Sequence, residues 1–279
     1  MDTPEIAIIG GGNMGRALIG GLVARGAAPG SIRVGEAIAS CREGLERDFG
    51  VVTTAENAQA ASGAGVIVVC VKPQDAGAAL RSLRPQLAAS RALVISVAAG
   101  IQVSSLQAWC GPEVPVVRAM PNRPALVGAG ASGLYAPAGV DQRCRDRAEA
   151  IMSAVGAVVW LRAEEELDTV TALSGSGPAY FFYLAELMMQ AAVELGLEES
   201  TARTLAVQTL YGAGRLAHES DGDLARLRAE VTSKGGTTEA ALKVFGAGEA
   251  LPALVTRALT AAADRGRELA CQFGAEARR

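Results

Sequence analysis

The chain has 279 residues with a net charge of −3, and it contains one histidine, 33 glycines and five cysteines. Hydrophobic residues make up 50% of the chain and charged residues 20%, a balance that excludes a disordered protein. The single histidine, His218, argues against a His-rich metal site and against Ser-His-Asp or Cys-His catalysis, so we expect no metal. The net charge gives no general attraction to nucleic acid or to an anionic membrane. At about 150 residues per domain, the length predicts two domains.

The cysteines are odd in number, widely scattered and without CxxC spacing. This pattern indicates reduced thiols in a cytoplasmic protein and argues against a disulfide framework or a zinc site. No signal peptide is evident at the N-terminus. The five are Cys41, Cys70, Cys110, Cys144 and Cys271.

Short apolar runs alternate with Ala-, Leu- and Arg-rich segments in the first part of the chain. The runs at 65–71 and 92–97 are almost continuously apolar, which is typical of strands buried on both faces of a parallel sheet. The alternation predicts an α/β, Rossmann-type doubly wound N-terminal domain. Strands are predicted at 5–9, 32–34, 65–71, 92–97, 114–119 and 156–161, and helices include 14–26, 40–48 and 74–88.

The pattern changes near residue 162, after which no convincing strand remains. We therefore expect an α/β domain over 1–162 and an all-α domain over 163–279. The segment 178–196 is apolar except for a polar stripe, which predicts a soluble helix buried on most of its circumference. Its aromatic cluster at 180–183 predicts a packing centre between subunits. Further helices are predicted at 200–217, with Ser200 as N-cap, and at 223–230, 238–246 and 249–273.

A glycine-rich loop, GGGNMG at 10–15, follows the first predicted strand and precedes a helix. In the G-x-G-x-x-G pattern, Gly10 permits a tight turn, Gly12 lets the backbone approach a pyrophosphate, and Gly15 lets helix and strand pack closely. The N–H groups of the helix N-terminus then face the anion. This context predicts dinucleotide binding rather than a purely structural turn.

Glu36 lies at the end of the second predicted strand, 21 residues after Gly15. An acidic residue there commonly accepts hydrogen bonds from the adenosine ribose of NAD and repels the 2′-phosphate of NADP. The alternative is a surface glutamate in a turn. Arg33 and Arg42 lie nearby and are candidates for holding a phosphate, so the residues leave the choice of NADH or NADPH open.

Three further loops follow predicted strands, at the edge where such sheets bind ligands: VKPQ at 71–74, VAAG at 97–100 and MPNRP at 120–124. Asn122 either binds the cofactor or caps a rigid turn between two prolines. Two donor-rich loops, SGSGP at 174–178 and TSKGGTT at 232–238, precede helices in the second part. They either bind an anion such as a carboxylate or are simply capped helix starts.

These motifs together resemble the Δ1-pyrroline-5-carboxylate reductase family. The resemblance runs nearly end to end, through GGGNMG, VKPQ, SVAAG, AMPNRP, SGSGPAY and VTSKGGTTEA, and the last two are the most specific. It implies hydride transfer from NADPH or NADH to the C=N bond of 1-pyrroline-5-carboxylate, which gives L-proline. It also implies a dinucleotide-binding N-terminal domain and a helical domain for substrate binding and dimerisation, with homodimers that also assemble into rings such as decamers.

The resemblance also implies a set of site residues. Thr238 is the implied catalytic residue, which hydrogen-bonds the ring nitrogen. The substrate carboxylate is implied to be held by Ser176, Ser233, Gly236 and Thr237. The implied cofactor-binding residues are Gly10, Gly12, Asn13, Met14, Gly15, Glu36, Asn57, Val71, Lys72, Pro73, Ala98, Gly100 and Asn122.

The sequence departs from the usual family pattern at four positions. Arg123 replaces a usual Thr, Lys234 a common Pro, and Glu230 a common Asn. Glu36 stands where NADPH-preferring members often have Ser or Thr, which favours NADH. Asp221 or Glu230 is a candidate for meeting the iminium charge, and a surface carboxylate is the alternative.

Two other functions are alternatives to the reduction of 1-pyrroline-5-carboxylate. A β-hydroxyacid dehydrogenase or related imine reductase shares the Rossmann start, but the hydroxyacid enzymes use a lysine on the helix after a glycine-rich loop. The only lysines here are Lys72, Lys234 and Lys243, and none lies in 178–196. A non-catalytic dinucleotide-binding protein would retain GGGNMG without needing the donor groups of 232–238.

Overall fold

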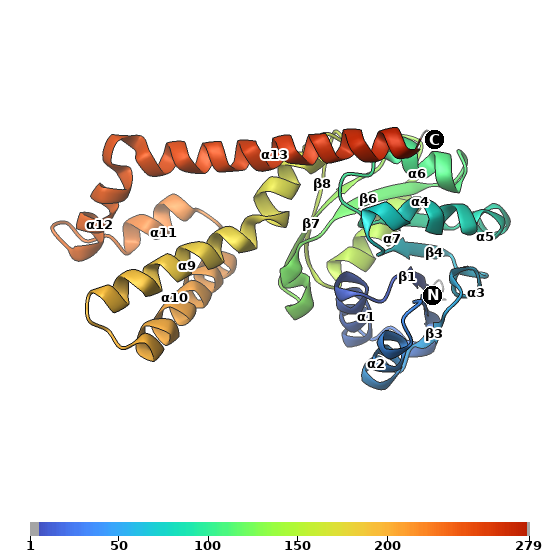
Figure 1. Cartoon of the computed structure of the whole chain (residues 1–279), viewed down its shortest axis with the longest axis horizontal. Helices are drawn as coiled ribbons and strands as arrows, with labels where there is room; N and C mark the ends of the chain where they lie inside the picture. Colours follow the sequence, from blue (N-terminus) through green and yellow to red (C-terminus); the bar gives the residue numbers. More distant parts are fainter. Residues whose placement is uncertain (1–5, 278–279) are drawn as a thin grey trace. The chain divides into compact units, whose positions relative to one another are not determined.

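The computed structural model describes residues 6–277 and divides the chain into two compact units (Figure 1). The first contains the residues up to Ser176 together with those from Ala262 onward, and the second contains Gly177–Ala261. The domain boundary expected near residue 162 stays a prediction.

The first unit is built on one sheet of eight strands in the order β3-β2-β1-β4-β5-β6-β7-β8. Neighbouring strands pair in parallel except for β6 and β7, which are antiparallel. The strand order reverses between β1 and β4, and this reversal creates the crevice at which doubly wound sheets bind ligands. The strands are β1 (Ile6–Ile9), β2 (Ile32–Gly35), β3 (Val52–Thr54), β4 (Val66–Val69), β5 (Leu93–Ser96), β6 (Val116–Met120), β7 (Gly130–Tyr135) and β8 (Gly156–Trp160).

The Rossmann-type α/β prediction is confirmed, but β3 and β7 were not predicted. β3 has three residues at the sheet edge and is only partly buried, so it lacks a long apolar run. β7 contains two glycines, and both are required by close packing. A Cβ at Gly133 would lie 2.9 Å from Val170, and one at Gly130 would lie 2.8 Å from the carbonyl oxygen of Val155.

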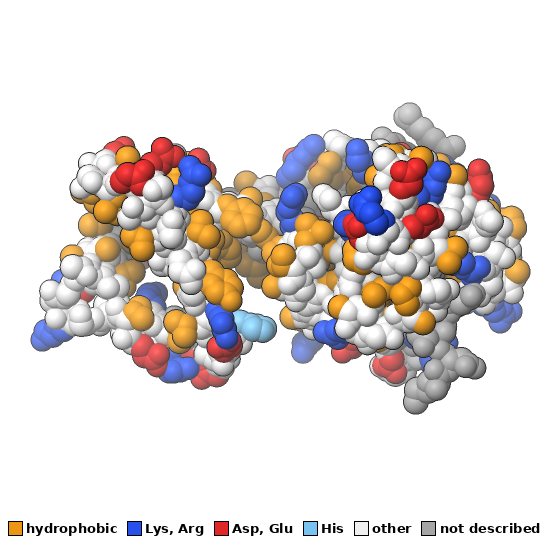
Figure 2. Space-filling view, turned by 90° about the horizontal axis from the view of Figure 1, so that it is seen from below, with side chains coloured by type: hydrophobic (Ala, Val, Ile, Leu, Met, Phe, Trp, Pro, Cys, Tyr) orange, Lys and Arg blue, Asp and Glu red, His pale blue; other side chains and the backbone are white. Residues whose placement is uncertain are grey.

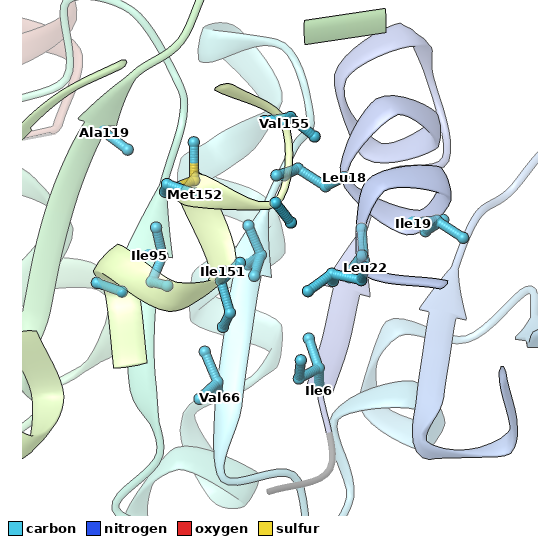
Figure 3. Packing of buried hydrophobic residues seen from close by; sticks show 14 of the residues in the cluster. Ile6, Leu18, Ile19, Leu22, Val66, Ile95, Ala119, Ile151, Met152 and Val155 are labelled. Carbon is cyan, nitrogen blue, oxygen red and sulfur yellow. The ribbon is translucent and has the colours of Figure 1, made fainter. Parts of the chain in front are cut away.

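Helices cover both faces of the sheet, so its residues alternate between two hydrophobic clusters. Ile6 and Ile8 face one cluster, and Ala7 and Ile9 face the other. The first cluster is covered by α1 (Asn13–Ala24), α2 (Ala39–Phe49) and α7 (Gln142–Ser153), and the second by α3 (Asn57–Ala61), α4 (Pro73–Ser82), α5 (Arg84–Ser90) and α6 (Val103–Cys110). Figure 3 shows the first cluster, where Leu18, Leu22, Ile151 and Met152 of the helices pack over Ile6, Val66 and Ile95 of the strands.

The single helix predicted over 74–88 is wrong, because the structure breaks it at Leu83 into α4 and α5. Pro85 lies in the first turn of α5. A proline there has no N–H to continue the preceding helix, and its ring clashes with the carbonyl of the turn before it. The break therefore follows directly from that residue.

The helical elements after β8 are α8 (Glu166–Val170), a π-helical turn η3 (Thr171–Gly175), α9 (Gly177–Glu194), α10 (Glu199–Glu219), α11 (Leu224–Glu230), α12 (Thr237–Gly246) and α13 (Ala250–Ala277). Short 3₁₀ turns are η1 (Pro29–Ser31), η2 (Arg123–Val127) and η4 (Ala247–Glu249). The Ser200 N-cap is wrong. Glu198 caps α10, and its carboxylate accepts a hydrogen bond from the amide of Thr201 at 3.1 Å.

Helix α9 departs from the expectation of a largely buried helix. Phe181, Phe182 and Tyr183 are 60%, 61% and 61% exposed in the single chain. Consecutive helical residues point about 100° apart, so α9 is uncovered on most of its circumference. Its apolar side chains therefore need a surface outside the chain. Within residues 6–277, no helix has the length and apolar character needed to cross a membrane.

Candidate active site

The glycine-rich loop has the geometry that its pattern predicts. Gly10 has φ of +101°, and a Cβ there would lie 2.9 Å from the carbonyl carbon of Cys70. A Cβ at Gly15 would lie 2.1 Å from the carbonyl oxygen of Gly10, so α1 and β1 pack as closely as only glycine permits. Gly12 has no atom within 4 Å of its Cβ direction. The loop is therefore tight where it turns and open where a phosphate would approach.

The N-terminus of α1 is suited to an anion. Gly12 is the N-cap and supplies no side-chain cap, and the first turn contains no acidic residue. Asn13 is exposed and Met14 half-buried at this end. The N–H groups of the first turn have no partner within their own helix, and the helix dipole adds positive potential there. These residues fit the pyrophosphate of a dinucleotide.

A cavity of about 270 Å³ lies at the carboxyl edge of the sheet, beside the strand-order reversal. It brings together predicted cofactor residues from three segments that are far apart in sequence. Four further lining residues were not named individually as site residues, although three of them lie in the loops 97–100 and 120–124 that were expected at the ligand-binding edge. The predicted members are Met14, Val71, Lys72, Pro73 and Ala98, and the four further residues are Cys70, Val97, Ala99 and Pro121.

Cys70 lines this cavity but does not supply a nucleophile. Burial raises the pKa of its thiol to about 12, so the group stays protonated at neutral pH. Among the described residues, no group of three or more His, Cys, Asp or Glu side chains is arranged to hold a metal ion. The site therefore offers backbone and small apolar surface for a flat ring.

A larger hollow of about 370 Å³ lies beside α1 and η2, and it contains none of the predicted site residues. Its one charged lining residue is Arg16, and that guanidinium is already paired with Asp48. The smaller cavity at the strand ends is therefore the better candidate for the cofactor.

Glu36 lies directly against the glycine-rich loop. Its Oε2 accepts a hydrogen bond from the amide of Gly11 at 2.8 Å, and its Oε1 accepts one from the amide of Ile38 at 2.9 Å. Each carboxylate oxygen keeps a second lone pair for a ribose hydroxyl. Arg42 donates to the carbonyl oxygens of Glu36 and Ala37, both at 2.8 Å. Arg33 donates to the carbonyl oxygen of Ser62. Both guanidinium groups thus have backbone partners.

Two other predicted cofactor residues have close neighbours in the first unit. Asn57 begins α3, and its Oδ1 would lie 2.5 Å from a Cβ at Gly35, so its side chain fits only beside a glycine. Gly100 has φ of +75°, and a Cβ there would lie 3.3 Å from Phe273 of α13. Packing against α13 is thus a structural reason for glycine at position 100.

Asn122 is buried and makes two hydrogen bonds through its side chain. Its Oδ1 accepts from the amide of Ala131 at 2.8 Å, and its Nδ2 donates to the carbonyl oxygen of Ser174 at 3.0 Å. The loop after β6 is thereby joined to β7 and to the SGSG segment. Ser176 is half-buried two residues further on, and its amide donates to Thr171 across the π-helical turn at 2.8 Å.

The loop before α12 presents donors that are not used as helix caps. The N-cap of α12 is Gly236, which has no side chain to cap with. The hydroxyls of Ser233, Thr237 and Thr238 are therefore not engaged in capping this helix, which argues against the capped-helix alternative. Lys234 is exposed, as is Arg123 in η2.

Gly236 lies inside the turn of this loop. Its amide donates to the carbonyl oxygen of Ser233 at 3.0 Å, so that N–H is already used within the turn. A Cβ at Gly236 would lie 2.4 Å from the hydroxyl oxygen of Ser233. Glycine at this position therefore makes room for the Ser233 side chain.

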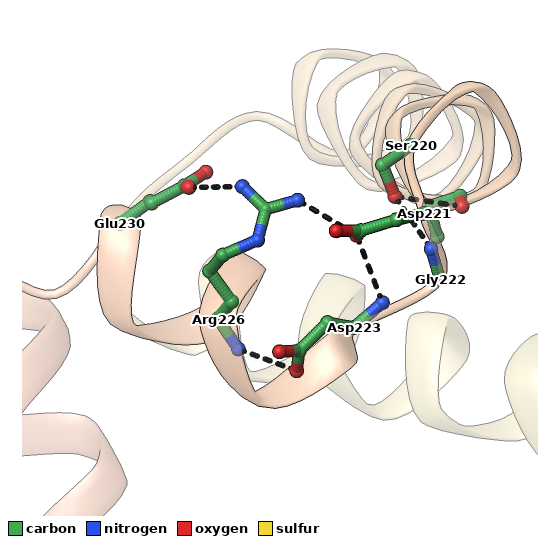
Figure 4. A network of polar contacts seen from close by, with 7 residues as sticks. Ser220, Asp221, Gly222, Asp223, Arg226 and Glu230 are labelled. Atoms are coloured by element: carbon green, nitrogen blue, oxygen red, sulfur yellow. Dashed lines mark hydrogen bonds and ion pairs between the residues drawn. The ribbon is translucent and has the colours of Figure 1, made fainter.

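The two candidate carboxylates for an iminium charge are both paired with one arginine (Figure 4). Arg226 donates to Oδ1 of Asp221 at 2.7 Å and to Oε1 of Glu230 at 2.6 Å. The hydrogen bond from Arg226 lowers the pKa of Asp221. Each carboxylate is thus already paired with Arg226 and exposed at the surface, which favours the surface alternative, although two carboxylates face one guanidinium.

Apolar side chains gather on the surface of the helical unit, as Figure 2 shows. An exposed apolar area of this extent marks an interaction surface. The exposed apolar side chains of this surface include Phe181, Phe182, Leu184, Leu187 and Met188 of α9 and Leu205, Val207 and Tyr211 of α10.

The sheet, the uncapped glycine-rich loop and the cavity at the strand ends define the class of the protein. It is an oxidoreductase with a Rossmann-type dinucleotide-binding unit. Comparisons with known proteins then give the family. Residues 164–269 match the family described as pyrroline-5-carboxylate reductase dimerisation, and residues 5–100 match the coenzyme F420-dependent NADP oxidoreductase family.

A pyrroline-5-carboxylate reductase from Pseudomonas aeruginosa is 47% identical over 274 residues, which cover 98% of this chain and 100% of that protein. The solved structure of a pyrroline-5-carboxylate reductase from Coxiella burnetii matches with a TM-score of 0.92 at 43% identity, covering 96% of this chain and 99% of its own. A pyrroline carboxylate reductase from Plasmodium falciparum, solved with NADP bound, matches at 0.82 and 26% identity, covering 97% and 99%.

The chain belongs to the pyrroline-5-carboxylate reductase family. It is an NAD(P)H-dependent oxidoreductase that acts on a cyclic imine, and its place is in proline biosynthesis. The resemblance seen in its motifs is confirmed, and neither a hydroxyacid dehydrogenase nor a silent binding protein is favoured. Residues 164–269 match the dimerisation region of this family, and they include the exposed apolar side chains of α9 and α10.

Proposed function

We propose that the chain reduces 1-pyrroline-5-carboxylate to L-proline with the donors of residues 233–238 and Ser176 holding the substrate. The observation that carries this assignment is the start of α12, where Gly236 is the N-cap and no side chain caps the helix. Hydroxyls and first-turn N–H groups are thereby left for a carboxylate, although the first turn also contains Glu239, whose carboxylate accepts a hydrogen bond from the amide of Gly235 at 2.7 Å.

The chemistry of the substrate explains why the proposed site needs no strong acid or base for catalysis. A cyclic imine is readily protonated, and its iminium form is a good hydride acceptor, so a strong general acid is dispensable. NADH or NADPH, when bound, supplies the hydride. The protein's task is to hold the carboxylate and the ring in the reactive orientation.

Within this proposal Thr238 hydrogen-bonds the ring nitrogen, and it is half-buried in the first turn of α12. Ser233, Thr237 and Ser176 hold the carboxylate. Gly236 contributes by giving the Ser233 hydroxyl its room, since its own N–H is used in the turn.

The proposed cofactor-binding residues lie in the first unit. Gly12, Asn13 and Met14 receive the pyrophosphate in a loop shaped by Gly10 and Gly15, while Val71, Lys72, Pro73 and Ala98 border the nicotinamide. Glu36 receives the ribose, and its negative charge favours NADH over NADPH. Asn57 and Gly100 complete the set as neighbours of these loops.

We also propose a homodimer formed through the exposed apolar helices, working in the cytoplasm. The five free thiols support a reducing compartment. Decameric rings are the larger assembly proposed for such dimers, and light scattering at several protein concentrations distinguishes a dimer from a decamer.

The test of the function is oxidation of NADH or NADPH on addition of 1-pyrroline-5-carboxylate, followed by absorbance. Thr238→Ala is expected to lower kcat/KM about tenfold to a hundredfold with cofactor affinity nearly unchanged, because a hydrogen bond to a charged group is worth about 1.5–3 kcal/mol. Thr232→Ala is the matched control, since that hydroxyl donates to the carbonyl oxygen of Arg228 within its own turn. Equal kcat/KM for Thr238→Ala and the wild type would refute the role of Thr238.

A further inference from the structure

The SGSG segment contains a carbonyl group whose α-helical donor is missing. The chain is helical through α8, the π-helical turn and the start of α9. In an α-helix the carbonyl oxygen of Ser174 would accept from the N–H of residue 178. That residue is Pro178, which has no N–H. The Ser174 carbonyl therefore has no α-helical partner and is open to a donor from another part of the chain.

Asn122 supplies that donor from the loop after β6. Its Nδ2 lies 3.0 Å from the carbonyl oxygen of Ser174, and its Oδ1 lies 2.8 Å from the amide nitrogen of Ala131. The two partners fix the orientation of the amide, because a flipped side chain would set oxygen against oxygen and N–H against N–H. With 9% exposure, Asn122 is held from both sides.

Two other contacts hold the same segment in place. The amide of Ser176 donates to the carbonyl oxygen of Thr171, which closes the π-helical turn. A Cβ at Gly175 would lie 2.9 Å from Cε of Met120, so Gly175 lies directly against the end of β6. π-Helical turns are frequent at functional sites, where they displace a residue from regular helical geometry. Here the displaced residue is Ser176.

We propose that Asn122 is a positioning residue for the imine substrate, acting through Ser174 to place the Ser176 hydroxyl, and is not a ligand of the cofactor. This inference rests on the proposed function, in which Ser176 holds the substrate carboxylate. It replaces the cofactor contact expected for Asn122 from sequence. It also explains the proline at position 178. Because Pro178 has no N–H, the carbonyl oxygen of Ser174 accepts from Asn122 in the loop after β6.

The main variant is Asn122→Asp, which keeps the size of the side chain and its acceptor for the Ala131 amide. It replaces the donor to Ser174 by an oxygen that repels the carbonyl. We expect KM for 1-pyrroline-5-carboxylate to rise about tenfold, while the Kd values for NADH and NADPH, measured by fluorescence titration, stay within about twofold. The contrasting variant is Asn57→Asp, which is expected to raise the cofactor Kd and to leave the imine KM unchanged.

A double-mutant cycle distinguishes positioning from a general loss of stability. In a Ser176→Ala background the hydroxyl to be positioned is gone, so Asn122→Asp should change the imine KM by less than about twofold. If Asn122→Asp does not fold, as judged by circular dichroism, Asn122→Ala removes both hydrogen bonds without adding a charge and carries the same cycle.

The outcomes separate the two proposals. A raised cofactor Kd with an unchanged imine KM would make Asn122 a cofactor ligand and overturn the inference. The same rise in KM with and without Ser176 would also overturn it. A wild-type protein that does not turn over 1-pyrroline-5-carboxylate would instead refute the proposed function itself.

Discussion

The two units of this chain bury their apolar residues in different ways. In the sheet unit, side chains on both faces of the strands are covered by helices of the same chain, and Ile8, Ile9 and Ile67 have no exposed surface. Between Gly177 and Ala261, the only hydrophobic residue that is buried is Ala202. Large aromatic and aliphatic side chains of α9 and α10 are instead exposed.

The difference shows that a Rossmann sheet supplies its own core, whereas the helical unit does not bury one within a single chain. Fully burying a large apolar side chain contributes about 1.5–3 kcal/mol, and the helical unit gains little of this within one chain. Stability of the sheet unit is therefore expected to be a property of the single chain. Stability of the helical unit is expected to depend on protein concentration.

The largest effect is expected from a charge placed in the dimerisation surface. Phe182→Asp puts a carboxylate where the proposed homodimer buries an aromatic ring, and desolvation of an unpaired charge costs several kcal/mol. The dimer dissociation constant should rise at least about a hundredfold, and reductase activity should fall with it. Sedimentation velocity over a range of concentrations measures the dissociation constant.

Val127→Asp is the matched control for this variant. Val127 is 80% exposed, but it lies on the sheet unit, in η2. The dissociation constant should equal that of the wild type. If Phe182→Asp left the dimer unchanged, or if Val127→Asp abolished it, the dimer interface would not lie on the helical unit.

The next effect concerns the sheet core. Ile95→Ala removes atoms from the fully buried cluster of Figure 3 and should lower the free energy of unfolding by about 2–5 kcal/mol. Urea denaturation checks the loss, which should be the same at low and high protein concentration. A loss that grew on dilution would show that the sheet unit also depends on dimerisation.

A smaller effect is expected from the charge beside the glycine-rich loop. Glu36→Gln keeps the shape of the side chain but removes the negative charge that would repel a 2′-phosphate. The ratio of kcat/KM for NADPH to that for NADH should rise about tenfold. The imine KM should not change, since the Glu36 carboxylate is bonded to the loops after β1 and β2. A fixed cofactor ratio would remove Glu36 from cofactor selection.

The smallest effect is expected at the start of α7, where Asp141 accepts a hydrogen bond from the amide of Cys144 at 2.7 Å. That bond lowers the pKa of Asp141, so its stabilisation is complete above the unfolded pKa of about 3.9 and is lost as the pH falls through the lower folded pKa. Asp141→Ala should lower Tm at pH 7, and the difference from wild type should shrink below about pH 4. Asp141→Asn, which keeps an acceptor, serves as the control. A difference that persists unchanged to pH 2 would exclude the ionised cap.

Local patterns were sufficient to predict most of the sheet unit. Strands such as β4 and β5 are continuous apolar runs because both of their faces are covered. The loops that follow them could be predicted to bind a ligand because they lie at the carboxyl ends of the strands. β7 could not be predicted from its residues, since close packing against Val170 and Val155 requires glycines that local patterns disfavour in strands.

The site was predicted less completely, because its decisive contacts join distant residues. Nothing near Asn122 in the sequence indicates that its partner is Ser174, 52 residues further along the chain. The N-cap of α12 was equally hidden, since Ser and Thr are the usual caps and the structure uses Gly236. The exposure of α9 in the single chain could not be predicted, because periodicity shows that a helix has an apolar surface and not which chain covers it.

Helix α13 begins in the helical unit and ends on the sheet unit, where Ala270 is buried and Phe273 packs against the second hydrophobic cluster. The ribosome therefore delivers the last piece of the first unit only after the whole helical unit has been synthesised. A nascent chain that stops before α13 has a sheet with part of one face uncovered. Residues 262–277 thus tie the completion of the first unit to the synthesis of the whole helical unit.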